Sequence, residues 1–239
     1  MSFLTLVRHG QASFFEDDYD KLSPLGEEQS RALGRYWAEQ GVTFDRAYTG
    51  TLKRQIRTDE CIAEPFREAG LPWPEVERLE GLNEYQADQI MDRLLPELCV
   101  RDETYARLKK AYDSSTEGHD RYRNFHRLLE AVMEVWVSGE YDANGFTPWT
   151  EFRDGVHAAL ERILTAEGRG ANVVVASSGG PIGVSVQTAL EAPEIKACEL
   201  NWRIHNCSLT EFTFTPRRFT LDQFNAIPHL TDPELLTYR

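Results

Sequence analysis

The chain has 239 residues, 41% of them hydrophobic and 27% charged, which is enough for a folded domain and unlike a disordered chain. Its net charge of −13 opposes non-specific attraction to nucleic acid or to an anionic membrane surface. No apolar run is long enough to span a membrane and the start lacks the pattern of a signal peptide, so we expect a cytoplasmic protein without nucleic-acid or membrane partners.

The cysteines are widely scattered, at Cys61, Cys99, Cys198 and Cys207, and none of them forms a CxxC pair. This spacing predicts reduced thiols and neither a zinc site nor a disulfide framework. The six histidines show no ligand spacing such as His-Glu-x-x-His. We therefore predict no metal and no cofactor.

Short apolar runs alternate with helical segments in the first part of the chain. Residues 3–7 form an apolar run that ends in Arg-His-Gly, and Ser23-Pro24 is a good helix start, with Gly41 as the stop. We expect strands at 3–7, 46–49 and 78–82 and helices at 24–40 and 52–69. Strands that alternate with helices in this way are typical of a parallel sheet.

The segment of about residues 86–148 differs, because it is charged and helical throughout, and it predicts an α-helical insertion. After it we expect a helix at 150–167, a strand at 172–177, a helix opening at Gly179-Gly180-Pro181, and closing strands at 209–214 and 219–224. The pattern predicts a three-layer α/β/α fold with a mainly parallel central sheet. We interpret residues 1–239 as a single domain that carries the insertion.

Arg8, His9 and Gly10 directly follow the first strand, where open α/β sheets place their ligand crevice. A guanidinium presents a planar fork that matches phosphate oxygens. Cationic neighbours disfavour the imidazolium form of a histidine and so keep a lone pair available for nucleophilic attack. A lone Arg-His-Gly is a weak signal, and a surface turn is its alternative interpretation.

A second arginine strengthens the interpretation. Arg54 follows the second strand and falls in the first turn of the next helix, whose N-terminus favours anions. Arg8 and Arg54 could therefore converge on one phosphate group. The neighbouring Lys53 and Arg57 are better explained as a solvated helix face.

At these residues the chain resembles the histidine phosphatase superfamily, whose fold is phosphoglycerate mutase-like. The resemblance is carried by Arg8-His9-Gly10, by residues 50–58, by Leu82-Asn83-Glu84 and by the segment Leu22 to Gln29, which is similar to the family's Leu-(Ser/Thr)-x-x-Gly-x-x-Gln. It covers residues 3 to about 214 apart from the insertion. The ordered set of motifs is far more specific than any one of them.

The resemblance implies a catalytic role for His9 and Glu84. His9 would attack phosphorus and become a phosphohistidine, while Arg8 and Arg54 hold the phosphoryl oxygens. Glu84 would protonate the leaving alkoxide and then help to activate water. A purely structural ion pair of Glu84 with an arginine is the alternative.

One position departs from the family. Where its members usually have a second catalytic histidine before Gly-Gly, this chain has Ser178, followed by Gly179 and Gly180. A hydroxyl donates one neutral hydrogen bond, about half as strong as the charge-assisted bond of an imidazolium. The backbone N–H groups at Gly179 and the helix start could replace part of that lost field.

Three hypotheses follow for the function. The leading one is a metal-independent phosphatase that acts on a small phosphomonoester through His9, with activity reduced by Ser178; a phosphoglycerate-mutase-type phosphotransferase is its less favoured variant. The second is a catalytically impaired module that binds phosphate or a phosphoester at Arg8, Arg54, Ser178 and Gly179. The third is a scaffold whose helical insertion binds another protein. The first two imply a small phosphorylated molecule or inorganic phosphate as partner, and nothing in the sequence indicates an oligomeric state.

Overall fold

The structure is a computed structural model that describes residues 1–239 except 14–19, 117, 142–144, 167–169, 216 and 239. The chain divides into two compact units, Met1–Glu84 with Gly155–Arg239, and Tyr85–Asp154. Among the described helices, none has both the length and the apolarity needed to cross a membrane. That the whole chain is one domain with an insertion at about 86–148 stays a prediction.

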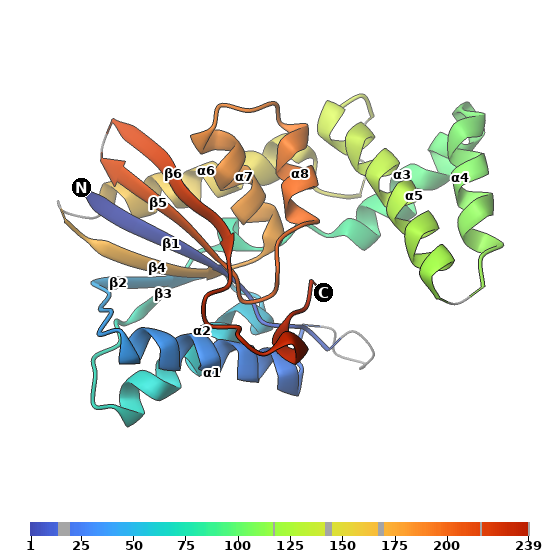
Figure 1. The fold of residues 1–239 in the computed structure, drawn as a ribbon. Coiled ribbons are helices and arrows are strands. Elements are labelled where there is room, and N and C mark those ends of the chain that lie inside the picture. The colour runs from blue at the N-terminus through green and yellow to red at the C-terminus, as the bar shows by residue number, and fades with distance from the viewer. Residues whose placement is uncertain (14–19, 117, 142–144, 167–169, 216, 239) are drawn as a thin grey trace. The chain divides into compact units, whose positions relative to one another are not determined.

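A six-stranded sheet forms the first unit, with strand order β3-β2-β4-β1-β5-β6 (Figure 1). The neighbouring pairs β3/β2, β2/β4 and β4/β1 are parallel, whereas β1/β5 and β5/β6 are antiparallel. The strands are β1 (Ser2–Arg8), β2 (Arg46–Thr49), β3 (Val76–Arg78), β4 (Asn172–Ser177), β5 (Leu209–Thr215) and β6 (Arg218–Ala226). The predicted mainly parallel sheet is confirmed.

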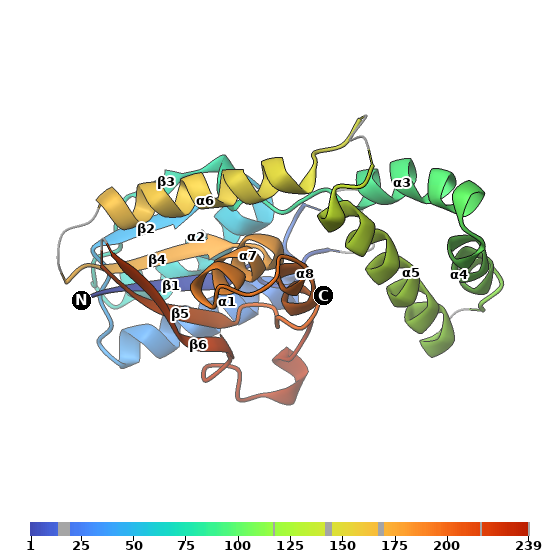
Figure 2. The same cartoon turned by 90° about the horizontal axis from the view of Figure 1, so that it is seen from above.

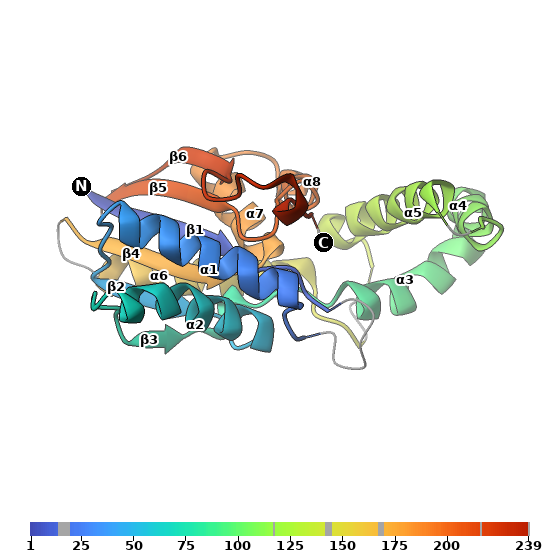
Figure 3. The same ribbon diagram turned by 60° about the horizontal axis from the view of Figure 1, so that its bottom comes forward.

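Helices cover both faces of this sheet. Figure 3 shows α1 (Pro24–Glu39) and α2 (Lys53–Glu68) in front of one face. The other face carries α7 (Gly179–Ala189), α8 (Ile195–Asn201) and the part of α6 (Trp149–Ala166) that follows Asp154 (Figure 2). Strands β1 and β4 are buried along nearly their whole length, which is why both are runs of apolar residues without alternation. The three-layer α/β/α fold is confirmed.

The register of the parallel strands brings their carboxyl ends to one edge. Arg8 at the end of β1 lies opposite Ser177 at the end of β4, and Thr49 at the end of β2 lies opposite Ala176. Thr49 also pairs with Arg78, the last residue of β3. The loops after β1, β2, β3 and β4 therefore start side by side, although they come from distant parts of the chain.

The loop after β1 docks on the start of α1. Ser23 caps the helix, since its Oγ accepts a hydrogen bond of 3.1 Å from the Gly26 N–H, and Pro24 occupies the first turn as predicted. A Cβ atom on Gly10 would lie 2.3 Å from the Gly26 carbonyl oxygen. Glycine at position 10 thus lets the backbone after His9 pack directly on α1.

The strand predicted at 78–82 is wrong. Strand β3 ends at Arg78 because its partner β2 ends at Thr49, and residues Glu80–Leu82 form a 3₁₀ helix, η1. A Cβ atom on Gly81 would lie 2.1 Å from the Gly155 carbonyl oxygen, so the chain passes closely against α6 here. With no strand to pair with, these residues turn toward the sheet edge that carries the other loops.

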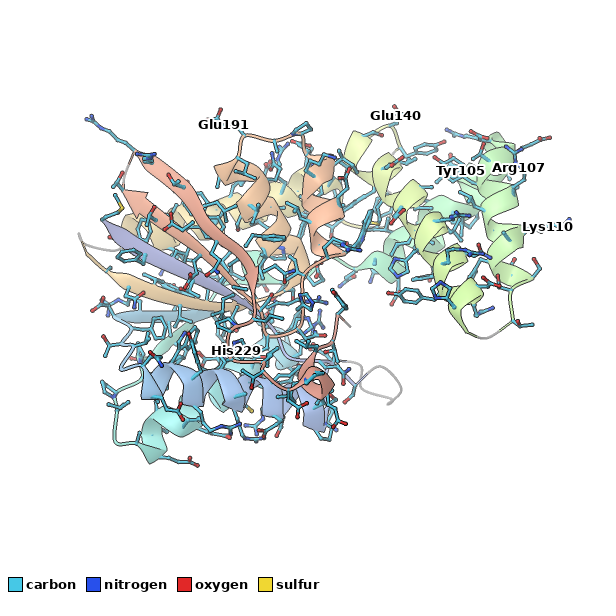
Figure 4. All side chains as sticks on the ribbon, viewed as in Figure 1. Tyr105, Arg107, Lys110, Glu140, Glu191 and His229 are labelled. Carbon is cyan, nitrogen blue, oxygen red and sulfur yellow. The ribbon has the colours of Figure 1, made fainter. Side chains whose placement is uncertain are left out.

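The second unit is helical, in agreement with the prediction for this region. It contains α3 (Ala87–Arg101), α4 (Glu103–Asp113), α5 (His119–Ser138) and the first residues of α6. Apolar side chains at helical spacing on α3 and α5 are buried, among them Ile90, Leu94, Leu98, Leu128 and Val132. Helix α4, which carries Tyr105, Arg107 and Lys110 in Figure 4, has no buried residue. It is held to α5 in part by Arg121, whose guanidinium stacks on the Tyr112 ring at 4.4 Å.

Histidine 229 is buried in the segment that follows β6 and runs over α1 (Figure 4). Its ring lies 6.4 Å from that of Tyr36, between centroids, and burial lowers its pKa from 6.5 to about 4. The unfolded chain therefore takes up this proton at a higher pH than the folded chain does. The folded state loses stability as the pH falls below 6.5.

We predict that His229→Phe removes this acid sensitivity. Between pH 7 and pH 4 the free energy of unfolding of the wild type should fall by up to about 3 kcal/mol more than that of the variant. This energy corresponds to the difference between the pKa of His229 in the unfolded chain, 6.5, and in the folded chain, about 4. Urea unfolding at a series of pH values measures both curves. Parallel curves would show that His229 is not desolvated in the fold.

Candidate active site

His9 lies at the carboxyl end of β1, at the shared edge and next to the end of β4. Its N–H donates to the Ser177 carbonyl oxygen at 2.8 Å, which extends the β1/β4 ladder by one residue. Its carbonyl oxygen accepts from the Cys207 N–H at 3.2 Å and from Asn206 Nδ2 at 3.3 Å. The backbone on both sides of the imidazole is thus fixed by the sheet.

The ring of His9 is held in one tautomer. Nδ1 lies 2.7 Å from the Gly10 carbonyl oxygen, which can only accept, so Nδ1 carries the proton. Nε2 then has the lone pair, and it accepts a hydrogen bond of 3.2 Å from Arg54 Nε. Burial, and then the charges of Arg54 and Arg8, hold the pKa of His9 well below its usual value. Neutral His9 is the form that can act as a nucleophile.

Arg54 enters the site from the first turn of α2 and is itself buried. Besides His9 it binds Asp20, whose Oδ1 accepts from Nη1 at 2.7 Å. The other oxygen of Asp20 accepts from the Lys53 N–H at 2.8 Å. A carboxylate therefore balances the guanidinium and occupies the first N–H group of α2, a helix end that favours anions.

Arg8 is buried and reaches the C-terminal segment. Its Nη1 donates to the carbonyl oxygens of Ile204 and Tyr238, the second at 2.8 Å. The same segment is held by Gln29, whose Nε2 donates to the Leu235 carbonyl oxygen at 2.7 Å and to Thr237 Oγ1 at 2.9 Å. The last described residues of the chain are thus tied to the guanidinium at the end of β1.

Glu84 follows η1 and meets the start of α7. Both of its carboxyl oxygens lie 3.1 Å from the Gly180 N–H. The helix end that was expected to face a phosphate therefore holds the carboxyl group of Glu84 at Gly180. Gly179 is required for another reason, because a Cβ atom there would lie 1.8 Å from Asn201 Oδ1 on α8.

Ser178 lies between β4 and α7 and is completely buried. It occupies the N-cap position of α7, yet its side chain caps no N–H group of the helix. Its Oγ instead accepts a hydrogen bond of 2.8 Å from Gln55 Nε2 on α2. The hydroxyl is thus held by a side chain that the sequence analysis did not select.

The structure brings His9 and Arg54 into direct contact, and it connects Glu84 with the α7 start and Ser178 with α2. Three further groups that contact the predicted site residues were not predicted from the sequence. Asp20 and Gln55 had no motif to mark them, although both neighbour Arg54 in space, and the Tyr238 carbonyl carries no side-chain signal at all. His205 bonds Asn225 Oδ1 through its backbone N–H at 2.8 Å and its ring Nδ1 at 3.2 Å.

Nothing in the described part of the chain resembles a metal site, since it contains no cluster of three or more His, Cys, Asp or Glu side chains arranged to hold an ion. The groups at this edge of the sheet are the imidazole of His9 with the guanidinium of Arg54 against it, the guanidinium of Arg8 and, at the start of α7, the carboxyl group of Glu84. Such a set can bind a tetrahedral anion, attack it and move a proton.

Comparisons with known proteins show what the chain is similar to. The model of the Histidine phosphatase superfamily (branch 1) matches residues 4–146 and 130–227. A 2,3-bisphosphoglycerate-dependent phosphoglycerate mutase of Thermobifida fusca (strain YX) is 38% identical over 123 residues, which are 48% of this chain and 48% of that protein. The chain thus matches only about half the length of this curated relative.

Two solved structures illustrate the likeness in fold. Phosphoserine phosphatase of Entamoeba histolytica, in complex with 3-phosphoglyceric acid, superposes with a TM-score of 0.62 at 21% identity, covering 96% of this chain and 100% of that one. Phosphoglycerate mutase of Bacillus anthracis str. Sterne gives 0.64 at 17% identity, with 95% and 94% covered.

The environment of His9 predicts that its imidazole stays neutral at pH 6.5 and below. A titration of the histidine ring resonances by NMR should place its midpoint well under that of an exposed histidine. Arg54→Met should move the midpoint upward, because one cationic neighbour is removed while burial remains. A wild-type midpoint at or above 6.5 would contradict the geometry.

The Asp20–Arg54 pair predicts that Asp20→Asn tightens the binding of phosphate or vanadate. Asparagine keeps an oxygen for the Lys53 N–H but removes the charge that competes for the guanidinium. For a partly buried pair worth about 1 kcal/mol, the dissociation constant should fall about fivefold, as calorimetry can measure. Glu64→Gln is the control, because it removes the same charge from a carboxylate that pairs with Arg31 and Arg57 and not with Arg54. Weaker binding by Asp20→Asn would mean that Asp20 positions Arg54.

Proposed function

Since the chain belongs to the histidine phosphatase superfamily, branch 1, we propose that it is a metal-independent phosphatase that hydrolyses a small phosphomonoester through a phosphohistidine at His9. The observation that carries the proposal is the state of the imidazole. Its proton is on Nδ1, against the Gly10 carbonyl, and its lone pair is on Nε2, beside the guanidinium of Arg54. A structural histidine does not need this arrangement.

The first half of the reaction uses Nε2 as nucleophile. Its lone pair forms a bond to phosphorus while the bond between phosphorus and the ester oxygen breaks. Arg54 and Arg8 offset the negative charge of the phosphoryl oxygens. The leaving alkoxide takes a proton from the Glu84 carboxyl group, since an alkoxide is too basic to leave unaided. The products are an alcohol and phosphohistidine.

The second half returns the enzyme to its starting state. Glu84, now a carboxylate, takes a proton from a water molecule that attacks phosphorus. The bond between nitrogen and phosphorus breaks, its electron pair returns to Nε2, and inorganic phosphate leaves. Glu84 is again protonated, so one carboxyl group serves both steps.

Ser178 is the reason for proposing reduced activity. A second histidine would supply a charged donor to the phosphoryl group, and the removal of a comparable donor costs about 10²–10³ in rate. In this chain the Ser178 hydroxyl is buried and accepts a bond from Gln55. This observation also favours the second candidate, a module that binds a phosphoester with little or no turnover.

Phosphotransfer of the mutase type is a further candidate. It has one support, the likeness of about half the chain to a phosphoglycerate mutase. A mutase must protect its phosphohistidine from water. Trapping experiments separate the three candidates because they follow the phosphoenzyme directly.

We predict that a single turnover with 4-nitrophenyl phosphate forms an acid-labile phosphoenzyme that decays with the release of inorganic phosphate. His9→Ala should lower the rate of 4-nitrophenol release by at least about 10³-fold, because nothing else in the site can replace the nucleophile. Vanadate binding checks that the variant keeps its fold. If the wild type binds phosphate or vanadate but rapid-quench analysis detects no phosphoenzyme, the result would favour the binding module.

A further inference from the structure

Gln55 has no part in the chemistry above, although it lies next to Arg54 and is 0% exposed. Both hydrogens of its amide group are used. Nε2 donates to the Leu82 carbonyl oxygen at 2.7 Å and to Ser178 Oγ at 2.8 Å. Its Oε1 lies against Gly50, where a Cβ atom would come within 1.9 Å. A carboxamide can be buried without a loss of stability only where hydrogen-bond partners are held in place for its polar atoms.

These contacts connect three loops of the sheet edge. Gly50 follows β2, Leu82 follows β3 and Ser178 follows β4. These strands are neighbours, in the order β3-β2-β4, and backbone hydrogen bonds from the Leu79 and Gly50 N–H groups continue their pairing just past the strand ends. The carboxamide of Gln55 therefore continues, through a side chain, the alignment that the backbone ladder provides within the sheet.

The Leu82 carbonyl is the most consequential of the three partners. It accepts from Gln55 Nε2 and also from Ser177 Oγ, at 2.8 Å. Leu82 is buried and lies two residues before Glu84, so these two bonds fix the backbone from which the Glu84 carboxyl group projects. To leave a buried carbonyl without its bonds costs about 1–3 kcal/mol, enough to shift the local backbone.

We propose that Gln55 is the positioning residue of this site: it holds the Glu84 segment, through the Leu82 carbonyl, in register with the Ser178 loop. The proposal rests on the proposed function, in which Glu84 is the proton donor. Gln55 itself touches no reacting atom, since both of its amide hydrogens are taken. Its loss should therefore act through Glu84 and not through phosphate binding.

The test compares two substrates that differ in their need for a proton. Phenyl phosphate and 4-nitrophenyl phosphate are alike in shape, but 4-nitrophenol is by far the stronger acid, so its anion leaves without protonation. Gln55→Met keeps the length of the side chain and removes its hydrogen bonds. In single-turnover experiments Gln55→Met should slow the phosphorylation of His9 by phenyl phosphate at least about 10-fold. A well-positioned general acid accelerates a reaction by about 10²–10⁴-fold, and the variant should lose a part of this acceleration. The rate with 4-nitrophenyl phosphate should change by less than about threefold.

Ser177→Ala provides an independent variant. It removes the other bond to the Leu82 carbonyl without touching Gln55, and it should show the same dependence on the leaving group. Gln29→Met is the matched control, because Gln29 is equally buried and bonds the Gln11 N–H and the C-terminal segment. Any effect of that variant should be equal for the two substrates. The affinity for vanadate confirms that each protein is folded.

The possible results distinguish a failure of the inference about Gln55 from a failure of the proposed function. A wild type that is phosphorylated by neither substrate removes the proposed function. If the wild type is active but Gln55→Met and Ser177→Ala leave the ratio of the phenyl phosphate and 4-nitrophenyl phosphate rates unchanged, the inference about Gln55 is wrong and the proposed function stands. If Gln55→Met does not fold, Ser177→Ala decides by the same ratio.

Discussion

The hydrogen bond from Arg54 Nε to His9 Nε2 is the contact on which the arrangement of this site depends. It needs a neutral imidazole with its proton on Nδ1, and the Gly10 carbonyl provides for that proton. It also places a buried guanidinium where burial alone would be costly, since an uncompensated charge in the interior is strongly disfavoured. Asp20 supplies the compensation from the loop that precedes α1. The imidazole of His9, the guanidinium of Arg54 and the carboxylate of Asp20 therefore form one connected unit.

The other groups of the site also have partners within the chain. Nη1 of Arg8 holds two backbone carbonyls, and the Glu84 carboxyl group holds the N–H of Gly180. In the proposed function, binding of a phosphoester would therefore exchange hydrogen bonds and not simply add them, so the net gain for each new bond would be small. Selectivity for a dianion follows from the same exchange. Only a ligand with more charge than Asp20 or a carbonyl oxygen gains by competing for the two guanidiniums.

Much of the fold and of the candidate site follows from local patterns. The apolar runs of β1 and β4 predict a sheet buried on both faces, and Ser23-Pro24 predicts the start of α1. Arg8, His9 and Arg54 could be selected because they directly follow strands, and the carboxyl ends of parallel strands share one edge. These signals need only the order of residues along the chain.

The rest depends on pairings between distant positions. The end of β3 at Arg78 is set by the end of β2, which its own residues do not encode. Gln55 and Ser178 are 123 positions apart, Arg8 and Tyr238 are 230 apart, and no periodicity marks such contacts. A glutamine in the first turn of a helix is ordinarily solvated. Only the closeness of η1 and α7 to that turn makes Gln55 a buried residue.

The pair of Gln55 and Ser178 also bears on the histidine that the family resemblance led us to expect at position 178. Ser178 is completely buried with a carboxamide against its hydroxyl, so an imidazole at position 178 would need the space that Gln55 fills. Interiors are close-packed, and such a side chain cannot be added without the loss of another. The absence of a histidine is thus matched by the presence of a glutamine on the facing helix. The pair provides hydrogen bonds that join the loops, whereas in the proposed function a histidine at this position would add a third cationic donor to Arg8 and Arg54. If His9 is the nucleophile, as we propose, such a site keeps the contact between His9 and Arg54 but has one cationic donor fewer for the charge of the transition state. The proposed function therefore predicts a reduced rate with intact phosphate binding.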